Sequence, residues 1–146
     1  MATVVDDATL LAVLAGQSGL TLQAAADNGE LLTTSSWYYR LNRALHDPAS
    51  HGHLSRMAEN LPEGARTALF RVIEDLPPEI GFLHPRQLVP VMASLRLSKS
   101  VNFLAAEALG AALFTDAGIR VSAESPGLSR ACGELDIIFE VRSPFD

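Results

Sequence analysis

The sequence predicts an α/β fold of three layers, in which helices cover both faces of a mostly parallel central sheet. Short runs of β-branched and aliphatic residues alternate with longer segments of helical periodicity along the chain. Strands that are separated by helices pair in parallel through right-handed crossovers. The 146 residues, 48% hydrophobic and 19% charged, fit one globular domain over residues 1–146 with a substantial buried core.

The first part of the chain is predicted to hold two strands and three helices. A β-branched run that begins at Thr3 ends at Asp6-Asp7 and passes directly into an apolar helical pattern. Gly16 closes that helix, since glycine is common just after a helix end. The expected elements after the first strand are a helix over Thr9–Ala15, a short helix around Leu22–Ala26, a strand over Leu31–Thr34 and a helix over Ser35–Leu45.

The middle of the chain is predicted to be helical with proline boundaries. The segment Asp47–Asn60 reads as a loop or a weakly helical excursion. Pro62 suits a first helical turn, and the helix that follows runs to Leu76, where two prolines stop it. Pro90 is expected in the first turn of the next helix, near Gln87–Leu97.

The last part of the chain is predicted to return twice to the sheet. A helix that is apolar almost all round, and therefore buried, is expected to reach about Thr115. Ser98 or Ser100 is its expected N-cap. The remaining expected elements are a strand over Gly118–Ser122 that ends at Ala123-Glu124, a helix from Pro126 to Cys132 that Gly133 ends, and a closing strand over Leu135–Val141.

Charge and composition narrow the classes of function. The formal net charge of −6 argues against non-specific binding of nucleic acid through overall charge. Asp6 and Asp7 interrupt the N-terminal apolar run, and Val101–Phe114 is too short for a membrane span, so neither a signal peptide nor a membrane segment is expected. The lone Cys132 fits a small core residue in a cytoplasmic protein. Ten arginines against one lysine suggest a bacterial genome of high GC content.

Two acids stand at the predicted carboxyl ends of strands. Asp6 follows the first strand and Glu124 follows the strand near Ile119–Ala123. The carboxyl ends of parallel strands are where ligands gather in open α/β sheets, and carboxylates suit Mg²⁺ or Mn²⁺. A structural alternative stands beside this one, because Asp6 is equally suited to cap a helix N-terminus, and Glu124 or Ser125 to begin the helix at Pro126.

The order and spacing of these segments resemble those of PIN domains. The run Val4–Leu14, Val-Val-Asp-Asp-Ala-Thr-Leu-Leu-Ala-Val-Leu, is similar to the first strand, its terminal Asp and the following helix of that family. The run Ala105–Leu109, and then Ile119–Glu124 with Leu128 and Ala131 behind it, resembles the closing half, where a buried helix precedes a strand ending in Thr-x-Asp. The resemblance implies the three-layer fold and, in active members, a Mg²⁺- or Mn²⁺-dependent endoribonuclease. Many such enzymes are toxins of bacterial toxin–antitoxin pairs, and many form homodimers.

The resemblance also indicates a degenerate acidic site. It assigns metal-binding roles to Asp6 and to Glu124, which replaces the family's late Asp. The family's second acid falls near Ser36, and its third falls near Asn102, so that two neutral side chains stand where carboxylates are expected. In a ribonuclease built from these residues, Asp6 and Glu124 would hold the ion with Ser36 and Asn102 as auxiliary catalytic ligands. Glu107 lies two turns inside its predicted helix, where only a shifted register would let it substitute.

The helix after the second strand carries a second candidate surface. Trp37, Tyr39, Arg40 and Arg43 could stack bases and contact phosphates of single-stranded RNA, although aromatics there are more often core or dimer contacts. The histidines at positions 46, 51 and 53 have loose metal-like spacing but no fourth ligand nearby, which favours a solvated loop.

Together these observations predict a cytoplasmic PIN-like protein that acts as a non-catalytic regulatory or interaction protein. The expected partners are a second copy of the chain and an antitoxin or other protein. Two alternatives remain open: a divergent Mg²⁺- or Mn²⁺-dependent ribonuclease that uses Asp6 and Glu124, and an RNA-binding module that uses the helix around Arg43.

Overall fold

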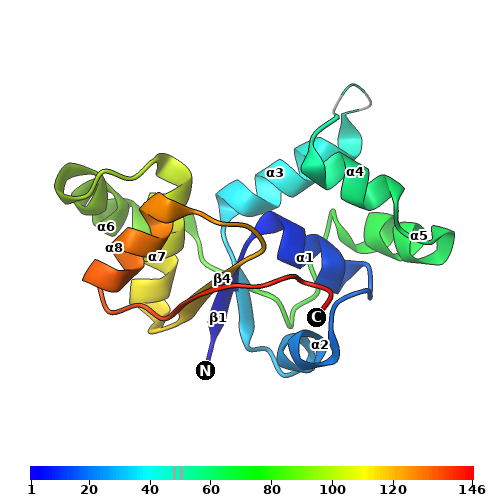
Figure 1. Ribbon diagram of the computed structural model, residues 1–146, viewed down its shortest axis with the longest axis horizontal. Helices are drawn as coiled ribbons and strands as arrows, with labels where there is room; N and C mark the ends of the chain where they lie inside the picture. Colours follow the sequence, from blue (N-terminus) through cyan, green and yellow to red (C-terminus); the bar gives the residue numbers. More distant parts are fainter. Residues whose placement is uncertain (48, 50) are drawn as a thin grey trace.

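The computed structural model describes residues 1–47, 49 and 51–146, and it confirms the three-layer α/β/α fold. In Figure 1 the strands rise through the centre of the molecule, with α6, α7 and α8 on one side and α1 and α2 on the other. The strands are β1 Thr3–Val5, β2 Leu31–Thr33, β3 Gly81–Phe82, β4 Gly118–Val121 and β5 Phe139–Val141. The helices are α1 Asp7–Leu14, α2 Leu20–Asp27, α3 Ser35–His46, α4 His53–Glu59, α5 Glu63–Val72, α6 Pro85–Ser98, α7 Phe103–Thr115 and α8 Pro126–Glu134.

The sheet is parallel throughout, with the strand order β3-β2-β1-β4-β5. The chain first builds outward from β1 to β2 and β3, and then returns to place β4 on the other side of β1. In the register of that central pair, Val5 lies opposite Arg120. The order of the strands therefore reverses between β1 and β4, and this reversal point is where ligands bind in open α/β sheets.

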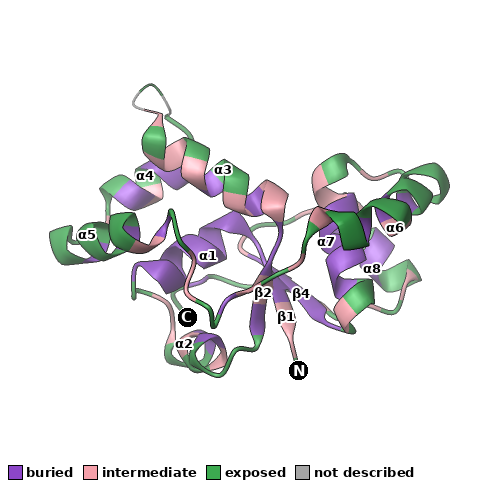
Figure 2. Ribbon diagram, turned by 180° about the vertical axis from the view of Figure 1, so that it is seen from behind, coloured by how far each residue is buried: buried purple, intermediate pink, exposed green. Residues whose placement is uncertain are grey.

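The core divides into two clusters, one on each face of the sheet. Val5 and Leu31 face a cluster built with α1 to α5, whereas Val4, Ile119 and Val121 face a cluster built with α6, α7 and α8. Neighbouring residues such as Val4 and Val5 enter opposite clusters because successive side chains of a strand point to opposite faces. Figure 2 shows β2, β4, α1 and much of α7 as buried. Their near-continuous apolar sequence follows from this, since a parallel sheet is covered on both faces.

Polar side chains fix where three of the helices begin. The side chains of Asp6, Thr34 and Asn102 accept hydrogen bonds from the backbone N–H groups three residues later, and so cap α1, α3 and α7. The expected cap of α7 at Ser98 or Ser100 is wrong. Lys99 ends α6 in extended backbone, and Asn102, also extended, is the residue whose side chain accepts from the first turn of α7.

Several other boundaries differ from those expected. The strand β3 was not predicted, because two residues carry no alternation pattern. The expected loop or weak helix over Asp47–Asn60 contains α4, while positions 48 and 50 of that segment lie outside the described residues. Pro90 lies within α6 and not in its first turn, which Pro85 occupies. Gly133 is inside α8 and does not end it.

The helices of the described residues include none with the length and apolar character that a membrane span requires.

Candidate functional site

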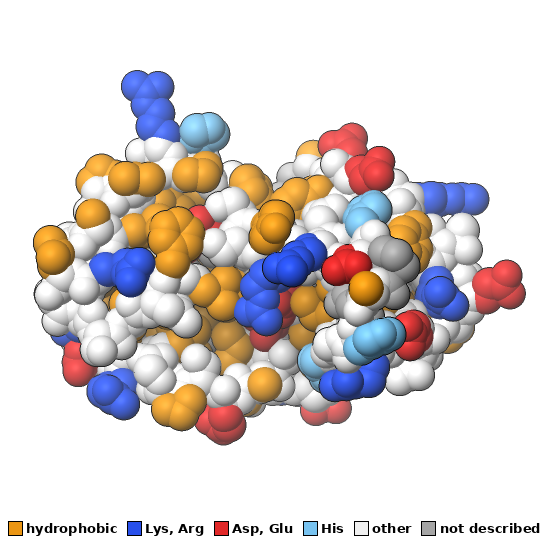
Figure 3. Space-filling model, turned by 90° about the horizontal axis from the view of Figure 1, so that it is seen from above, with side chains coloured by type: hydrophobic (Ala, Val, Ile, Leu, Met, Phe, Trp, Pro, Cys, Tyr) orange, Lys and Arg blue, Asp and Glu red, His pale blue; other side chains and the backbone are white. Residues whose placement is uncertain are grey.

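An open cleft of about 1040 Å³ lies at the carboxyl edge of the sheet, above the point where the strand order reverses. Its floor comes from the ends of β1 and β4, one wall from α3 and the start of α4, and the other from the beginnings of α7 and α8. Figure 3 views the molecule from above and shows basic side chains across the centre of this hollowed face, with acidic and apolar atoms beneath them. The cleft therefore brings together residues from both halves of the chain.

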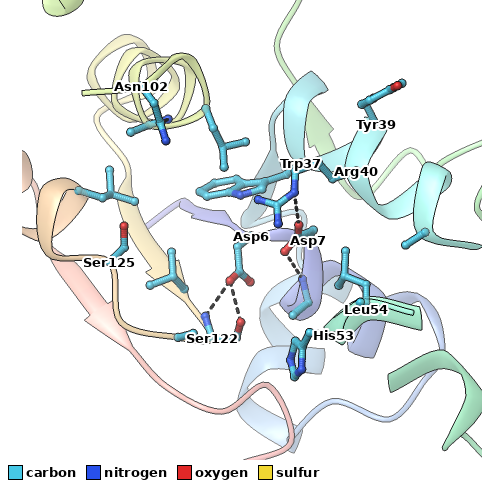
Figure 4. Close-up of a pocket in the computed structure, with 18 of the residues that line it drawn as sticks. Asp6, Asp7, Trp37, Tyr39, Arg40, His53, Leu54, Asn102, Ser122 and Ser125 are labelled. Carbon is cyan, nitrogen blue, oxygen red and sulfur yellow. Dashed lines mark hydrogen bonds and ion pairs between the residues drawn. The ribbon is translucent and has the colours of Figure 1, made fainter. Parts of the chain in front are cut away.

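Asp6 lies on the cleft floor and joins β1 to β4. Its Oδ1 accepts a hydrogen bond from the backbone N–H of Thr9 at 3.0 Å, and its Oδ2 accepts two, from the N–H and the hydroxyl of Ser122, both at 2.8 Å. Only 6% of Asp6 is exposed. Since a carboxylate offers about four acceptor positions, three of them are already used for structure. Figure 4 shows the carboxylate directed at Ser122 across the strand reversal.

Asp7 forms an ion pair with a cleft-wall arginine. The Asp7 Oδ2 lies 3.3 Å from Arg40 Nε, and Oδ1 accepts the N–H of Ala8 at 2.8 Å. Burial raises the pKa of Asp7, and the charge of Asp6 adds to that rise, whereas Arg40 lowers the pKa. The desolvation effect is the largest of these, because the Asp7 side chain is 10% exposed while that of Arg40 is 53% exposed. Arg40 thus covers the second acid of the floor, as Figure 4 shows.

Glu107 is a buried acid that accepts hydrogen bonds from the start of a neighbouring helix, α3. It lies within α7, is 2% exposed, and accepts the hydroxyl of Ser35 at 2.6 Å and the backbone N–H of Ser36 at 2.7 Å. These donors are at the start of α3, where the helix dipole favours a negative charge. The sequence places Glu107 too deep in its helix to bind a metal. A glutamate in a helix expected to be buried nevertheless indicates a hydrogen-bond partner within the core, and Glu107 is one of seven buried residues of α7.

The structure brings three of the four candidate site residues to the cleft. Asp6, Asn102 and Glu124 all line the cleft, but Ser36 is not among its lining residues and its N–H is committed to Glu107. Asn102 uses its Oδ1 to accept the N–H of Ala105 at 2.8 Å. Glu124 is exposed in the segment between β4 and α8.

The expected RNA- or partner-contact residues divide by exposure. Trp37 is 4% exposed and belongs to the core cluster of α6, α7 and α8, although it borders the cleft. Tyr39 is 62% exposed, and Arg40 and Arg43 are exposed cleft-wall residues. Within the described part of the chain Arg43 has no ion pair. His53, at the start of α4, lies on the same wall.

The donor set does not fit the divalent ion that the resemblance implies. Among the described residues no three His, Cys, Asp or Glu side chains are grouped so as to hold a metal. The oxygens of Asp6 already accept three hydrogen bonds, and Arg40 brings a positive charge to Asp7. A hard cation at this floor would compete with those donors for the same oxygens and would meet the repulsion of the guanidinium.

Comparison with models of known protein families finds no match. The search of curated proteins likewise finds no matching sequence.

Proposed function

We propose that this chain is a PIN-like domain that acts by binding a protein partner in its cleft and not by cleaving RNA. The observation that carries the proposal is the bonding of Asp6. Metal binding or proton transfer would use the oxygens of the Asp6 carboxylate, whereas these oxygens already cap α1 and hold Ser122.

The rest of the cleft supports a binding role. Its floor is occupied by internal contacts, while its mouth presents exposed groups such as Tyr39 and Arg43. Tyrosine and arginine are enriched where proteins recognise one another, because each combines a large contact area with directional polar groups. The lining also includes apolar residues of the opposite wall, such as Val101 and Leu104. A polypeptide segment that offers apolar and acidic side chains matches this lining.

The experiment that tests the proposal is a titration of Mn²⁺ and of Mg²⁺ by calorimetry into wild type and into the variant Asp6→Asn/Glu124→Gln. We expect no saturable binding to wild type at millimolar metal, and no cleavage of RNA under the same conditions. Saturable binding that the double substitution removes, together with metal-dependent cleavage, would establish the ribonuclease alternative. Circular dichroism of both proteins guards against a result that reflects unfolding.

A second candidate function, binding of single-stranded RNA, is favoured by Tyr39 and Arg43, which are both exposed on the cleft wall. An aromatic face can stack a base while an arginine contacts phosphate. Fluorescence anisotropy with a labelled single-stranded oligonucleotide distinguishes this candidate. Arg43→Glu should abolish binding if it is right, and Arg66→Glu, an exposed arginine of α5 outside the cleft lining, is the control.

A further inference from the structure

Beside its exposed polar residues, α6 exposes several apolar side chains, where the outer side of a surface helix is ordinarily polar. Val89 and Leu97 expose 56% and 91% of their surface, and Phe103, just beyond the helix, exposes 56%. Pro90 and Ala93 are exposed as well. At 3.6 residues per turn, positions 90, 93 and 97 follow one another along one side of the helix. We call these five residues the α6 face.

The α6 face is not needed for the core of this chain. The opposite side of the helix already buries Leu88, Met92 and Leu95. It packs closely on α7, where a Cβ added to Gly110 would lie 3.1 Å from Val91 Cγ1. Figures 1 and 2 show α6 at one end of the molecule, with much of its surface exposed. Several exposed apolar side chains that lie together mark an interaction site more often than a plain surface.

The charge around the α6 face is positive. The sequence from Ile80 to Ala106 contains no aspartate or glutamate, although the whole chain has a net charge of −6. Arg86 and Arg96 are exposed on α6, and neither forms an ion pair within the described residues. Lys99 is already paired, since its Nζ lies 2.7 Å from Glu134 Oε2. Two unpaired guanidinium groups therefore flank the apolar residues.

We propose that the α6 face docks an acidic amphipathic helix of a partner protein. The apolar side of such a helix would cover Leu97 and its neighbours, and its flanking carboxylates would pair with Arg86 and Arg96. A second copy of the chain fits less well. A two-fold contact brings the same surface together from both subunits, so that arginine would face arginine with no acid to compensate. None of the five residues of the α6 face lines the cleft, although Asn102 and Leu104, on either side of Phe103, do. This inference is therefore independent of the role of the cleft.

The probe is a fluorescein-labelled helical peptide with leucine at every third or fourth position and glutamate on both flanks. Its control is the same peptide with lysine in place of glutamate. Binding to the full chain is measured by fluorescence anisotropy. We expect the acidic peptide to bind at least about tenfold more tightly than the basic one, because close opposite charges are favourable and like charges are unfavourable at an interface.

Two matched pairs of variants locate the contact. Leu97→Asp should weaken binding about tenfold or more, as truncation of a central interface residue does. Leu20→Asp is the control, because Leu20 is 90% exposed but lies on α2. Arg96→Glu should weaken binding of the acidic peptide and strengthen that of the basic one, whereas Arg66→Glu on α5 should change neither. All four positions are exposed, so each variant is expected to fold.

Five results would overturn the proposal. The first three are that the acidic peptide fails to bind, that both peptides bind equally, and that Leu20→Asp weakens binding as much as Leu97→Asp does. In the fourth, sedimentation of the wild type shows a dimer that Leu97→Asp dissociates, which would assign the face to a second copy. Binding to vesicles of phosphatidylserine in place of the acidic peptide would assign it to a membrane surface. None of these results depends on metal or RNA, so they are separate from the test of the cleft.

Discussion

Asp6 links two strand ends through a single carboxylate, and this makes its substitution informative. Removal of the side chain in Asp6→Ala takes away the cap of α1 and the acceptor for both donors of Ser122. We expect a loss of about 2–4 kcal/mol in the free energy of unfolding, from a lost cap plus buried donors without a partner. Urea denaturation followed by circular dichroism measures it.

Asp6→Asn tests the structural role of Asp6 with a smaller change. The amide keeps one oxygen, which can serve Thr9 or Ser122 but not both, so the expected loss is smaller, about 1–2 kcal/mol. Ser122→Ala removes only the hydroxyl bond and should lose about 1 kcal/mol. If Asp6→Ala leaves stability unchanged, the carboxylate is not a structural element and our account of it fails.

Asp7 predicts a dependence of stability on pH. Burial raises its pKa in the folded chain above its ordinary value of 3.8, so the folded state binds the proton more tightly than the unfolded state does. Between those two pKa values the folded state holds more protons, and stability falls as the pH rises through that window. Below both values this penalty is absent. We expect the free energy of unfolding of Asp7→Asn, measured in urea at a series of pH values, to lack this fall.

A substitution of Arg40 tests the second influence on the pKa of Asp7. Its charge lowers the pKa of Asp7, in opposition to burial, so Arg40→Gln should raise the pKa further and steepen the fall of stability with pH. The carboxyl carbon of Asp7 in a labelled protein reports the pKa directly by NMR. A lower pKa in Arg40→Gln than in wild type would contradict the assigned ion pair.

At the scale of elements, Glu107 joins α7 to the start of α3. Glu107→Ala would leave the N–H of Ser36 and the hydroxyl of Ser35 without their acceptor in a site where the glutamate is 2% exposed. We expect a loss of about 2–4 kcal/mol, since the charge-assisted bonds and the packed volume both disappear. Glu107→Gln should lose less, because one amide oxygen can still accept the N–H of Ser36. Thermal unfolding of the two variants compares them, and equal stability of Glu107→Ala and wild type would refute the role.

Element types were more predictable than element boundaries. Element types can be read from apolar patterns, because an element that buries one or more of its faces needs apolar residues at its own period. This holds for the apolar runs of α1, α5 and α7 and for the β-branched runs of β1 and β4. Boundaries depend on single contacts. Ser98 is still the last residue of α6, and α7 begins only after Asn102, whose side chain accepts the N–H of Ala105. The two residues of β3 form a strand only because β2 offers them a partner.

The candidate site was predictable in position but not in bonding. A parallel sheet places the residues after β1 and β4 at one edge, so the sequence alone brings Asp6 near the segment that holds Glu124. It does not reveal that Asp6 bonds Ser122, or that Arg40 reaches across from α3 to cover Asp7, since both contacts depend on side-chain directions in the folded chain. Trp37 illustrates the same limit, because one turn of α3 separates this buried residue from the exposed Arg40.

For the whole molecule, the segment after β5 closes the sheet beside α1. Its Ser143 carbonyl accepts a hydrogen bond from Arg120 Nη2 at 2.9 Å, and its Pro144 carbonyl accepts the N–H of Gly19 at 3.1 Å. Burial lowers the pKa of Arg120, which is 6% exposed. The segment therefore covers a buried cation of β4, and its bond to Gly19 joins it to the loop between α1 and α2.

Gly19 is the point at which this closure is tightest. A Cβ added there would lie 1.8 Å from the carbonyl oxygen of Asp146, a distance that forces backbone to move. Gly19→Ala should therefore displace residues 143–146 and expose Arg120, with a loss of about 1–3 kcal/mol from overpacking and broken hydrogen bonds. Hydrogen exchange of the segment's amides should rise while that of β1 stays unchanged. Gly127→Ala is the matched control, since nothing lies within 4 Å of its added Cβ. Unchanged exchange in Gly19→Ala would show that the segment is not held against the loop between α1 and α2.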